Sequence, residues 1–170
     1  MTSPVDNGNR WAVLGLAIFA CGCVSMCMDQ TPAVALVNES PSLPKGVYVR
    51  TGRSEPRSGD TVALPQPPAA RAYLGGLGMP ARVRLIKRVA GTGGDTACFA
   101  DGAVTVGVRR VSSLAVDRRG AVLPRWTGCR VLEPDELFLL GDTPGSFDSR
   151  YFGPVRRSAV EGVYREVVTW

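Results

Sequence analysis

The stretch from Arg84 to Asp95 runs RLIKRVAGTGGD, which is typical of a strand that ends in a tight glycine turn. In a strand, Leu85 and Lys87 lie on one face, whereas Ile86 lies on the other. The lysine therefore has apolar neighbours on its own face. Burial there would lower the pKa of its amine from about 10.4 toward neutrality. This stretch predicts a strand that carries a usable amine base.

Strand-like runs flank this stretch on both sides and are separated by turn signals such as Ser58-Gly59-Asp60. They cover Gly46–Arg50, Thr61–Leu64, Val83–Ala90, Ala103–Val108, Glu136–Leu140 and Val160–Thr169. Pro67–Leu74 begins with proline, is followed by two glycines, and is the helix that the sequence predicts. Glycine (20) and proline (13) are frequent in the 170 residues, and aromatic residues are few (7%). We therefore expect a mostly β, antiparallel domain with one short helix.

Residues 11–28 (WAVLGLAIFACGCVSMCM) carry no charge, and as a helix they would span about 27 Å, close to the bilayer core of about 30 Å. Arg10 precedes this run, and no basic residue follows it until Lys45. This asymmetry places residues 1–10 in the cytoplasm and residues 29–170 outside it. Ala33-Val34-Ala35 matches a cleavage pattern, so a removed signal peptide is the alternative. The length of the apolar run favours a retained transmembrane anchor.

The five cysteines fall into two groups. Cys21, Cys23 and Cys27 lie inside the apolar run, where a thiol acts as a small apolar side chain, and lipidation is a minor alternative. Cys98 and Cys129 lie 31 residues apart in the exported part. A pair of cysteines in an oxidising compartment predicts one disulfide, with two buried thiols as the alternative.

The charged residues restrict the chemistry. The chain contains no histidine, which excludes histidine-dependent proteases and histidine-ligated metal sites within it. Of its 20 basic residues all but two are arginine, which cannot act as a base near neutral pH, so a lysine base is either Lys45 or Lys87. The arginines that give the net charge of +5 are scattered, so we expect no nucleic-acid partner. We also expect no metal and no cofactor.

Two further segments present hydroxyl groups: Asn38–Tyr48 (NESPSLPKGVY) and Leu140–Pro154 (LGDTPGSFDSRYFGP). Together with Arg84–Asp95, and in this order along the chain, they resemble the type I signal peptidase family. Ser40-Pro41-Ser42 is similar to its Ser-x-Ser box, Ile86–Val89 to its lysine box, and Ser146–Pro154 to its last signature box. A serine–lysine dyad needs a neutral lysine within hydrogen-bond reach of the nucleophilic hydroxyl.

The chain resembles more closely the TraF-type conjugal transfer peptidases of that superfamily. The shared motifs are Ser42–Tyr48 (SLPKGVY), Leu123–Cys129 (LPRWTGC) and the SFDSRYFGP run from Ser146, and the resemblance covers residues 36–158. Ordinary signal peptidases have an arginine and four residues between the Gly-Asp and the serine of the last box. Here only three residues separate Asp142 from Ser146, which favours the TraF-like branch.

The resemblance assigns a role to each matching residue. Ser42 is the expected nucleophile, and Lys87 is the expected general base. Ser40 is expected to help the Ser42 backbone N–H hold the oxyanion, Ser146 to orient the lysine amine, and Asp148 to pair with Arg150 and keep the last box in shape.

The resemblance also implies a signal-peptidase-like β-sheet domain behind an anchor in the bacterial inner membrane, with residues 29–170 as a serine-peptidase domain in the periplasm. The expected substrate is a pilin precursor for conjugative transfer or another protein with a signal peptide. Either water or the amino terminus of the pilin itself is the acceptor of the acyl group, and the second choice closes a ring. The alternatives are a general type I signal peptidase and, in another class, an inactive anchored scaffold of a secretion system.

Overall fold

The computed structural model describes residues 13, 14, 16 and 32–170. The chain divides into two units, Met1–Ala33 and Val34–Trp170, and the second contains every strand described below. The expected cytoplasmic segment 1–10 and all but three residues of the expected span 11–28 lie outside the described residues. Within the described ranges, no helix combines the length and the apolar character that a membrane crossing requires.

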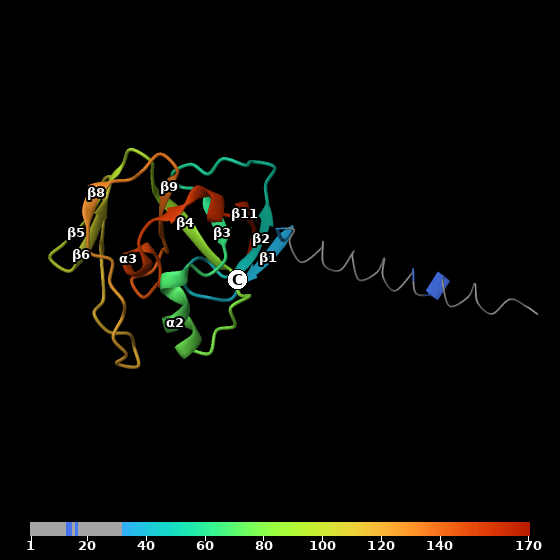
Figure 1. The fold of residues 1–170 in the computed structure, drawn as a ribbon, viewed down its shortest axis with the longest axis horizontal. Coiled ribbons are helices and arrows are strands. Elements are labelled where there is room, and N and C mark those ends of the chain that lie inside the picture. The colour runs from blue at the N-terminus through green and yellow to red at the C-terminus, as the bar shows by residue number, and fades with distance from the viewer. Residues whose placement is uncertain (1–12, 15, 17–31) are drawn as a thin grey trace, which may run out of the picture. The chain divides into compact units, whose positions relative to one another are not determined.

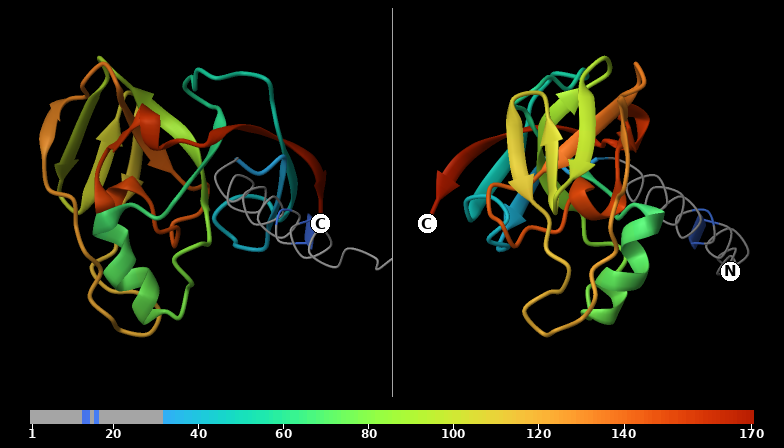
Figure 2. Two further views of the ribbon diagram at one scale, coloured as in Figure 1. Left: turned by 45° about the vertical axis from the view of Figure 1, so that its right-hand side comes forward. Right: turned by 90° about the vertical axis from the view of Figure 1, so that its left-hand side faces the viewer.

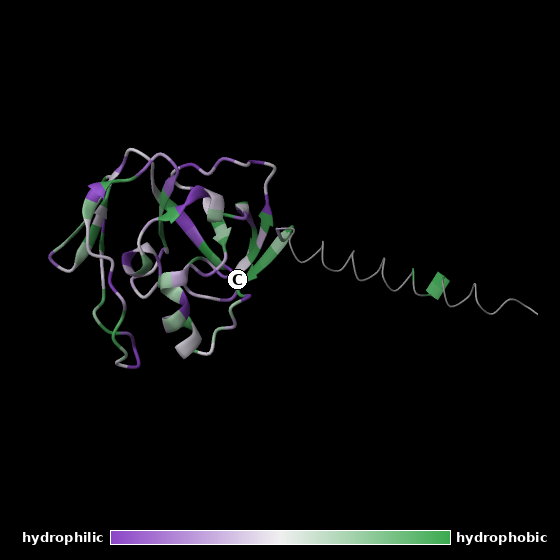
Figure 3. Cartoon of the chain, in the orientation of Figure 1, coloured by the Kyte–Doolittle hydropathy of each residue, from purple (hydrophilic) through white to green (hydrophobic). Residues whose placement is uncertain are grey.

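A seven-stranded antiparallel sheet forms the larger part of the domain, in the order β1-β2-β11-β3-β4-β9-β10 (Figure 1). Its strands are β1 (Ala35–Asn38), β2 (Gly46–Arg50), β3 (Thr61–Leu64), β4 (Leu85–Thr92), β9 (Glu136–Leu140), β10 (Val155–Arg156) and β11 (Gly162–Thr169). Strands β3, β4 and β9 lie inside the sheet and supply much of its core, including Val62, Val89 and Leu139. Strand β4 nevertheless carries a hydrophilic stretch, which Figure 3 shows in purple.

A second antiparallel sheet has four strands in the order β7-β6-β5-β8. These are β5 (Thr96–Ala100), β6 (Ala103–Val106), β7 (Arg109–Ser112) and β8 (Cys129–Val131). Figure 2 shows this sheet beside the larger one. Cys98 in β5 faces Cys129 in β8, and the two form the disulfide that the sequence predicts.

The helices are short and lie close to the last signature box. Helix α2 (Pro68–Gly76) starts with proline, whose fixed φ and missing N–H suit a first helical turn. Helix α3 (Ser149–Phe152) is a single turn capped by the Asp148 side chain, and η1 (Arg157–Ala159) is a 3₁₀ turn. The aromatic ring of Phe147 stacks between Tyr73 of α2 and Tyr151 of α3, which holds the two helices together.

The predicted fold class, a mostly β antiparallel domain, is confirmed. Strands β2, β3 and β9 match their predicted bounds, and α2 matches the predicted helix within two residues at its end. Strand β4 starts two residues later than predicted and continues into Gly91-Thr92. The sequence patterns did not predict α3 or the short strands β1, β5, β7, β8 and β10.

Candidate active site

Ser42 and Lys87 meet at the edge of the apolar core. Lys87 lies in the middle of β4 opposite Val62 of β3, and its side chain is only 4% exposed. Ser42, on the loop between β1 and β2, is 7% exposed. The lysine Nζ donates a hydrogen bond of 2.9 Å to the Ser42 Oγ, across 45 residues of sequence. Lys45 is exposed and takes no part in this contact.

Burial changes the proton affinity of Lys87. Desolvation by burial lowers its pKa from 10.5 to about 8, and the nearby charges of Asp148 and Arg150 act in opposite directions. Near pH 7 about one molecule in ten therefore carries a neutral amine, whereas an ordinary lysine is neutral in about one in several thousand. A neutral amine this close to a hydroxyl can remove its proton.

A chain of hydrogen bonds continues from the Ser42 hydroxyl. The Ser42 and Ser40 Oγ atoms are 2.8 Å apart, and the Ser40 hydroxyl donates to Asn38 Oδ1 at 2.9 Å. An amide oxygen can only accept, so the Ser40 proton is directed at Asn38, and Ser42 must then donate to Ser40. For Lys87 to act as a base, the Ser42 proton must turn toward the amine.

The same asparagine fixes the shape of the serine loop. Its side-chain amide donates to the carbonyl oxygens of Leu43 (3.1 Å) and Pro44 (3.0 Å), while Oδ1 also accepts the Ser40 N–H. Asn38 is 6% exposed, so losing these bonds would take the side-chain donor away from the Leu43 carbonyl, whereas the Pro44 carbonyl would keep the Tyr48 hydroxyl at 2.7 Å. No sequence motif singles out Asn38, because its contacts depend on the path of the loop.

Ser146 lies in the same hollow as the Ser42–Lys87 pair. The absence of a side chain at Gly141 makes room for it, because a Cβ there would overlap the Ser146 side chain. Ser146 is 3% exposed, and its Oγ has no hydrogen-bond partner within the described residues. The structure therefore places Ser146 beside the dyad, with no hydrogen bond between its Oγ and the lysine amine that it is expected to orient.

Asp148 and Arg150 form a completely buried ion pair behind Ser146. The arginine Nε and Nη2 donate to the two carboxylate oxygens, each at 2.8 Å, and both side chains are 0% exposed. Arg150 also donates to the carbonyl oxygens of Ser112 and Ser146. Asp148 in turn accepts the Gly141 N–H at 2.9 Å. This pair ties the Ser146 loop to the second sheet.

A second ion pair, between Arg88 and Asp142, is linked to the serine loop by a backbone hydrogen bond. Arg88 Nε donates to both carboxylate oxygens of Asp142, at 2.9 and 3.0 Å. The Asp142 N–H donates to the Ser42 carbonyl oxygen. The loops that carry Ser42 and Ser146 are therefore joined directly at this point.

The hollow beside the dyad has a volume of about 480 Å³ and a mostly apolar wall formed by β1, β4 and α2. Its apolar lining residues include Val37, Leu74, Met79, Leu85 and Ile86. Such a wall suits uncharged, apolar groups. Among the described residues, no three His, Cys, Asp or Glu side chains come together as a metal site would require.

Comparison with known proteins gives consistent matches. Residues 9–170 match the family described as "Signal peptidase, peptidase S26". A plasmid transfer protein TraF of Escherichia coli is 30% identical, covering 92% of this chain and 94% of the relative. A conjugal transfer protein TraF of Agrobacterium fabrum is 35% identical, covering 79% of this chain and 82% of the relative. A crystal structure of a signal peptidase I from Enterococcus faecalis aligns with a TM-score of 0.40 and 26% identity, covering 64% of this chain and 96% of that one.

Proposed function

Because the chain belongs to the signal peptidase family, peptidase S26, we propose that it is a serine endopeptidase in which Ser42 is the nucleophile and Lys87 the general base. The observation that carries this proposal is the 2.9 Å contact between a buried lysine amine and a serine hydroxyl. The lowered pKa of Lys87, which follows from its burial, makes that amine a competent base. An inactive scaffold would have no need for either feature.

The reaction proceeds in two steps. Lys87 Nζ takes the Ser42 proton as Oγ attacks the scissile carbonyl carbon, and the charged amine then gives this proton to the departing amino group. Water or another amine next attacks the acyl-enzyme, with Lys87 again accepting a proton and the Ser42 hydroxyl being restored. The Ser42 N–H and the Ser40 hydroxyl stabilise the oxyanion, for which the Ser40 proton turns away from Asn38 Oδ1. Donors of this kind contribute about 3 to 4 kcal/mol.

The substrate in this proposal is a pilin precursor processed for conjugative transfer. Support comes from the relatives that carry the names plasmid transfer protein and conjugal transfer protein. The short spacing between Asp142 and Ser146 points the same way, because it departs from the pattern of ordinary signal peptidases. In the second step, the acyl-enzyme is attacked either by the amino terminus of the pilin or by water.

The anchor belongs to the same proposal. Residues 11–28 would hold the enzyme in the inner membrane, with residues 29–170 in the periplasm. Ser42 lies only 14 residues beyond Met28, so the anchor would keep the nucleophile near the bilayer surface, where a membrane-bound precursor presents its cleavage site.

A processing assay tests this function. A tagged pilin precursor is expressed together with wild-type protein, with Ser42→Ala, or with Ser54→Ala, which changes an exposed serine in the loop after β2. We expect wild type and Ser54→Ala to shorten the precursor, and Ser42→Ala to leave it intact. Normal processing by Ser42→Ala would refute the assignment. The product mass distinguishes a linear chain from a ring, which is lighter by one water, about 18 Da.

A further inference from the structure

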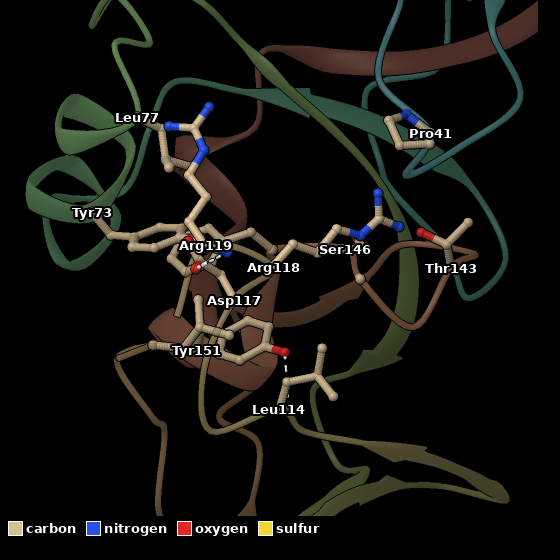
Figure 4. A pocket seen from close by; sticks show the side chains of 13 residues that line it. Pro41, Tyr73, Leu77, Leu114, Asp117, Arg118, Arg119, Thr143, Ser146 and Tyr151 are labelled. Atoms are coloured by element: carbon tan, nitrogen blue, oxygen red, sulfur yellow. Dashed lines mark hydrogen bonds between the residues drawn. The ribbon is translucent and has the colours of Figure 1, made fainter. Parts of the chain in front are cut away.

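A second pocket, of about 330 Å³, adjoins the hollow of the dyad (Figure 4). The two share a wall that includes Pro41, Tyr73, Thr143, Ser146 and Phe147. The second pocket is completed by the segment from Leu114 to Leu123, which also carries its charged side chains. A peptide that lies across Ser42 and extends past Ser146 would therefore enter this pocket.

The charged segment is held in a tight turn. The Asp117 carboxylate accepts the N–H groups of Arg119 and Ala121, at 2.8 and 2.9 Å. The Tyr73 hydroxyl of α2 donates to the same carboxylate at 2.9 Å. The side chains that follow Asp117 are therefore presented from a fixed turn that is tied to the pocket wall.

The charges of this turn leave one cation without a counterion. Desolvation is the largest single influence and raises the pKa of Asp117. The hydrogen bonds from Ala121, Tyr73 and Arg119, together with the charge of Arg119, outweigh it, so the pKa is lowered and the group is ionised at neutral pH. Asp117 and Arg119 thus offset each other. Arg118 makes no hydrogen bond or ion pair with the part of the chain that the structure describes.

Arg118 points at the loop beside the dyad. Figure 4 shows its side chain directed toward Thr143 and Ser146, whereas Arg119 extends past Leu77. A Cβ at Gly145 would lie 3.8 Å from Arg118 Nη2, so the guanidinium borders this loop. The buried Ser146 Oγ, which has no partner among the described residues, lies in the same wall.

We propose that this pocket is a subsite for a peptide carboxylate on the leaving-group side of the scissile bond, with Arg118 as its cation. The proposal rests on the proposed function. The carboxylate is the side chain of an acidic residue just after the cleavage point or the free carboxyl end of a short leaving peptide. A planar guanidinium with unused donors matches a carboxylate in shape and charge.

We assign the Arg118 pocket to the leaving half of the substrate because its lining is charged, whereas the lining of the hollow around Ser42 is mostly apolar. The acyl half of the substrate stays bound through the second step, and the apolar hollow around Ser42 suits lasting burial of uncharged side chains. The leaving half must dissociate once its bond is broken. An exposed arginine gives a weak, salt-screened contact that allows this release.

The test uses short synthetic peptides with an Ala-Leu-Ala cleavage site, a pattern typical of signal peptides. The second residue after the scissile bond is Glu, Gln or Lys, and the carboxyl end is either free or amidated, so the two sources of a carboxylate are separated. The assay uses the full-length protein in neutral detergent. If the carboxylate is a side chain, we expect kcat/KM to be about two- to fivefold higher for the Glu peptide than for the Gln peptide. If it is the carboxyl end, we expect the same difference between the free acid and the amide. The preference should disappear at about 1 M salt.

A variant with the charge at position 118 reversed tests whether Arg118 itself causes the preference. Arg118→Glu should make the Lys peptide the preferred one, while Arg110→Glu, at an exposed position on β7, should keep the wild-type order. Equal cleavage of Glu, Gln and Lys peptides by wild type, and of acid and amide, would overturn the subsite alone. No cleavage of any peptide by wild type would instead count against the proposed function. If Arg118→Glu slowed all peptides equally and weakened binding to vesicles that contain phosphatidylglycerol, the arginine would serve a lipid and the proposal would be wrong.

Discussion

At the scale of single residues, the environment of Lys87 sets the pH dependence of the reaction. Its pKa is lowered to about 8, so kcat/KM should rise about tenfold per pH unit below this value and level off above it. The unfolded chain holds this proton up to about pH 10.5, so the contribution of Lys87 to the unfolding free energy should increase between pH 8 and 10.5. A rate profile that is flat from pH 6 to 9 would contradict a lysine base.

Asn38 tests the hydrogen-bond chain behind the nucleophile. Asn38→Ala removes the acceptor for Ser40 and the donors to the Leu43 and Pro44 carbonyls, so we expect a loss of unfolding free energy of about 2 kcal/mol. We also expect kcat to fall at least about tenfold with little change in KM, because the serine loop loses its shape. Denaturant unfolding and steady-state kinetics measure the two effects.

A matched control is available in Gln66. It is also a buried amide that donates to two backbone carbonyls, those of Pro80 and Val83, but it contacts no residue of the dyad. Gln66→Ala should reduce stability by a similar amount and leave kcat nearly unchanged. If both variants lost the same fraction of kcat, Asn38 would have a structural role only.

At the scale of elements, the disulfide secures the edge strand β8 of the smaller sheet. It closes a sequence separation of 31 residues, and a loop of this size predicts a stabilisation of about 3.7 kcal/mol in the chain-entropy model. The variant with Cys98→Ser and Cys129→Ser should lose about this unfolding free energy. It should still cleave the Gln peptide, because Lys87 lies in β4 of the larger sheet and Ser42 on the loop between β1 and β2 of that sheet. Unchanged stability, or two alkylatable thiols in the unreduced protein, would contradict this expectation.

The elements that sequence patterns predicted are those with a clear period or a strong boundary. Strand β9 (Glu136–Leu140) contains the continuous apolar run Leu137–Leu140, and α2 has prolines at its start and glycines at its end. The short strands β5 and β8 have weak patterns, and their pairing depends on partners elsewhere in the chain. The same limit applies to the site. The motifs identified Ser42 and Lys87, whereas Asn38 and Arg118 are recognised only through contacts made in the folded chain.

At the scale of the whole molecule, the structure bears on where the mature chain begins. Removal of residues 1–35 would delete Ala35, the first residue of β1, and Val34, whose carbonyl oxygen accepts the Arg50 N–H at 2.8 Å. We therefore expect a retained anchor, as the length of the apolar run 11–28 also favours. Amino-terminal sequencing of the membrane fraction checks this. A mature chain that begins at Leu36 would show that the segment is a removed signal peptide.

Whether Lys87 is the base is tested by comparing two conservative exchanges in the precursor-processing assay. Arginine cannot release its proton near neutral pH, so Lys87→Arg should abolish cleavage. The same exchange at the exposed Lys45 should leave most activity. Circular dichroism of both variants confirms that they are folded, and Lys87→Met supplies an uncharged residue if arginine is not accommodated at this buried position. We expect processing by Lys45→Arg and none by either variant at position 87. Normal processing by Lys87→Arg, with none by Lys45→Arg, would contradict it.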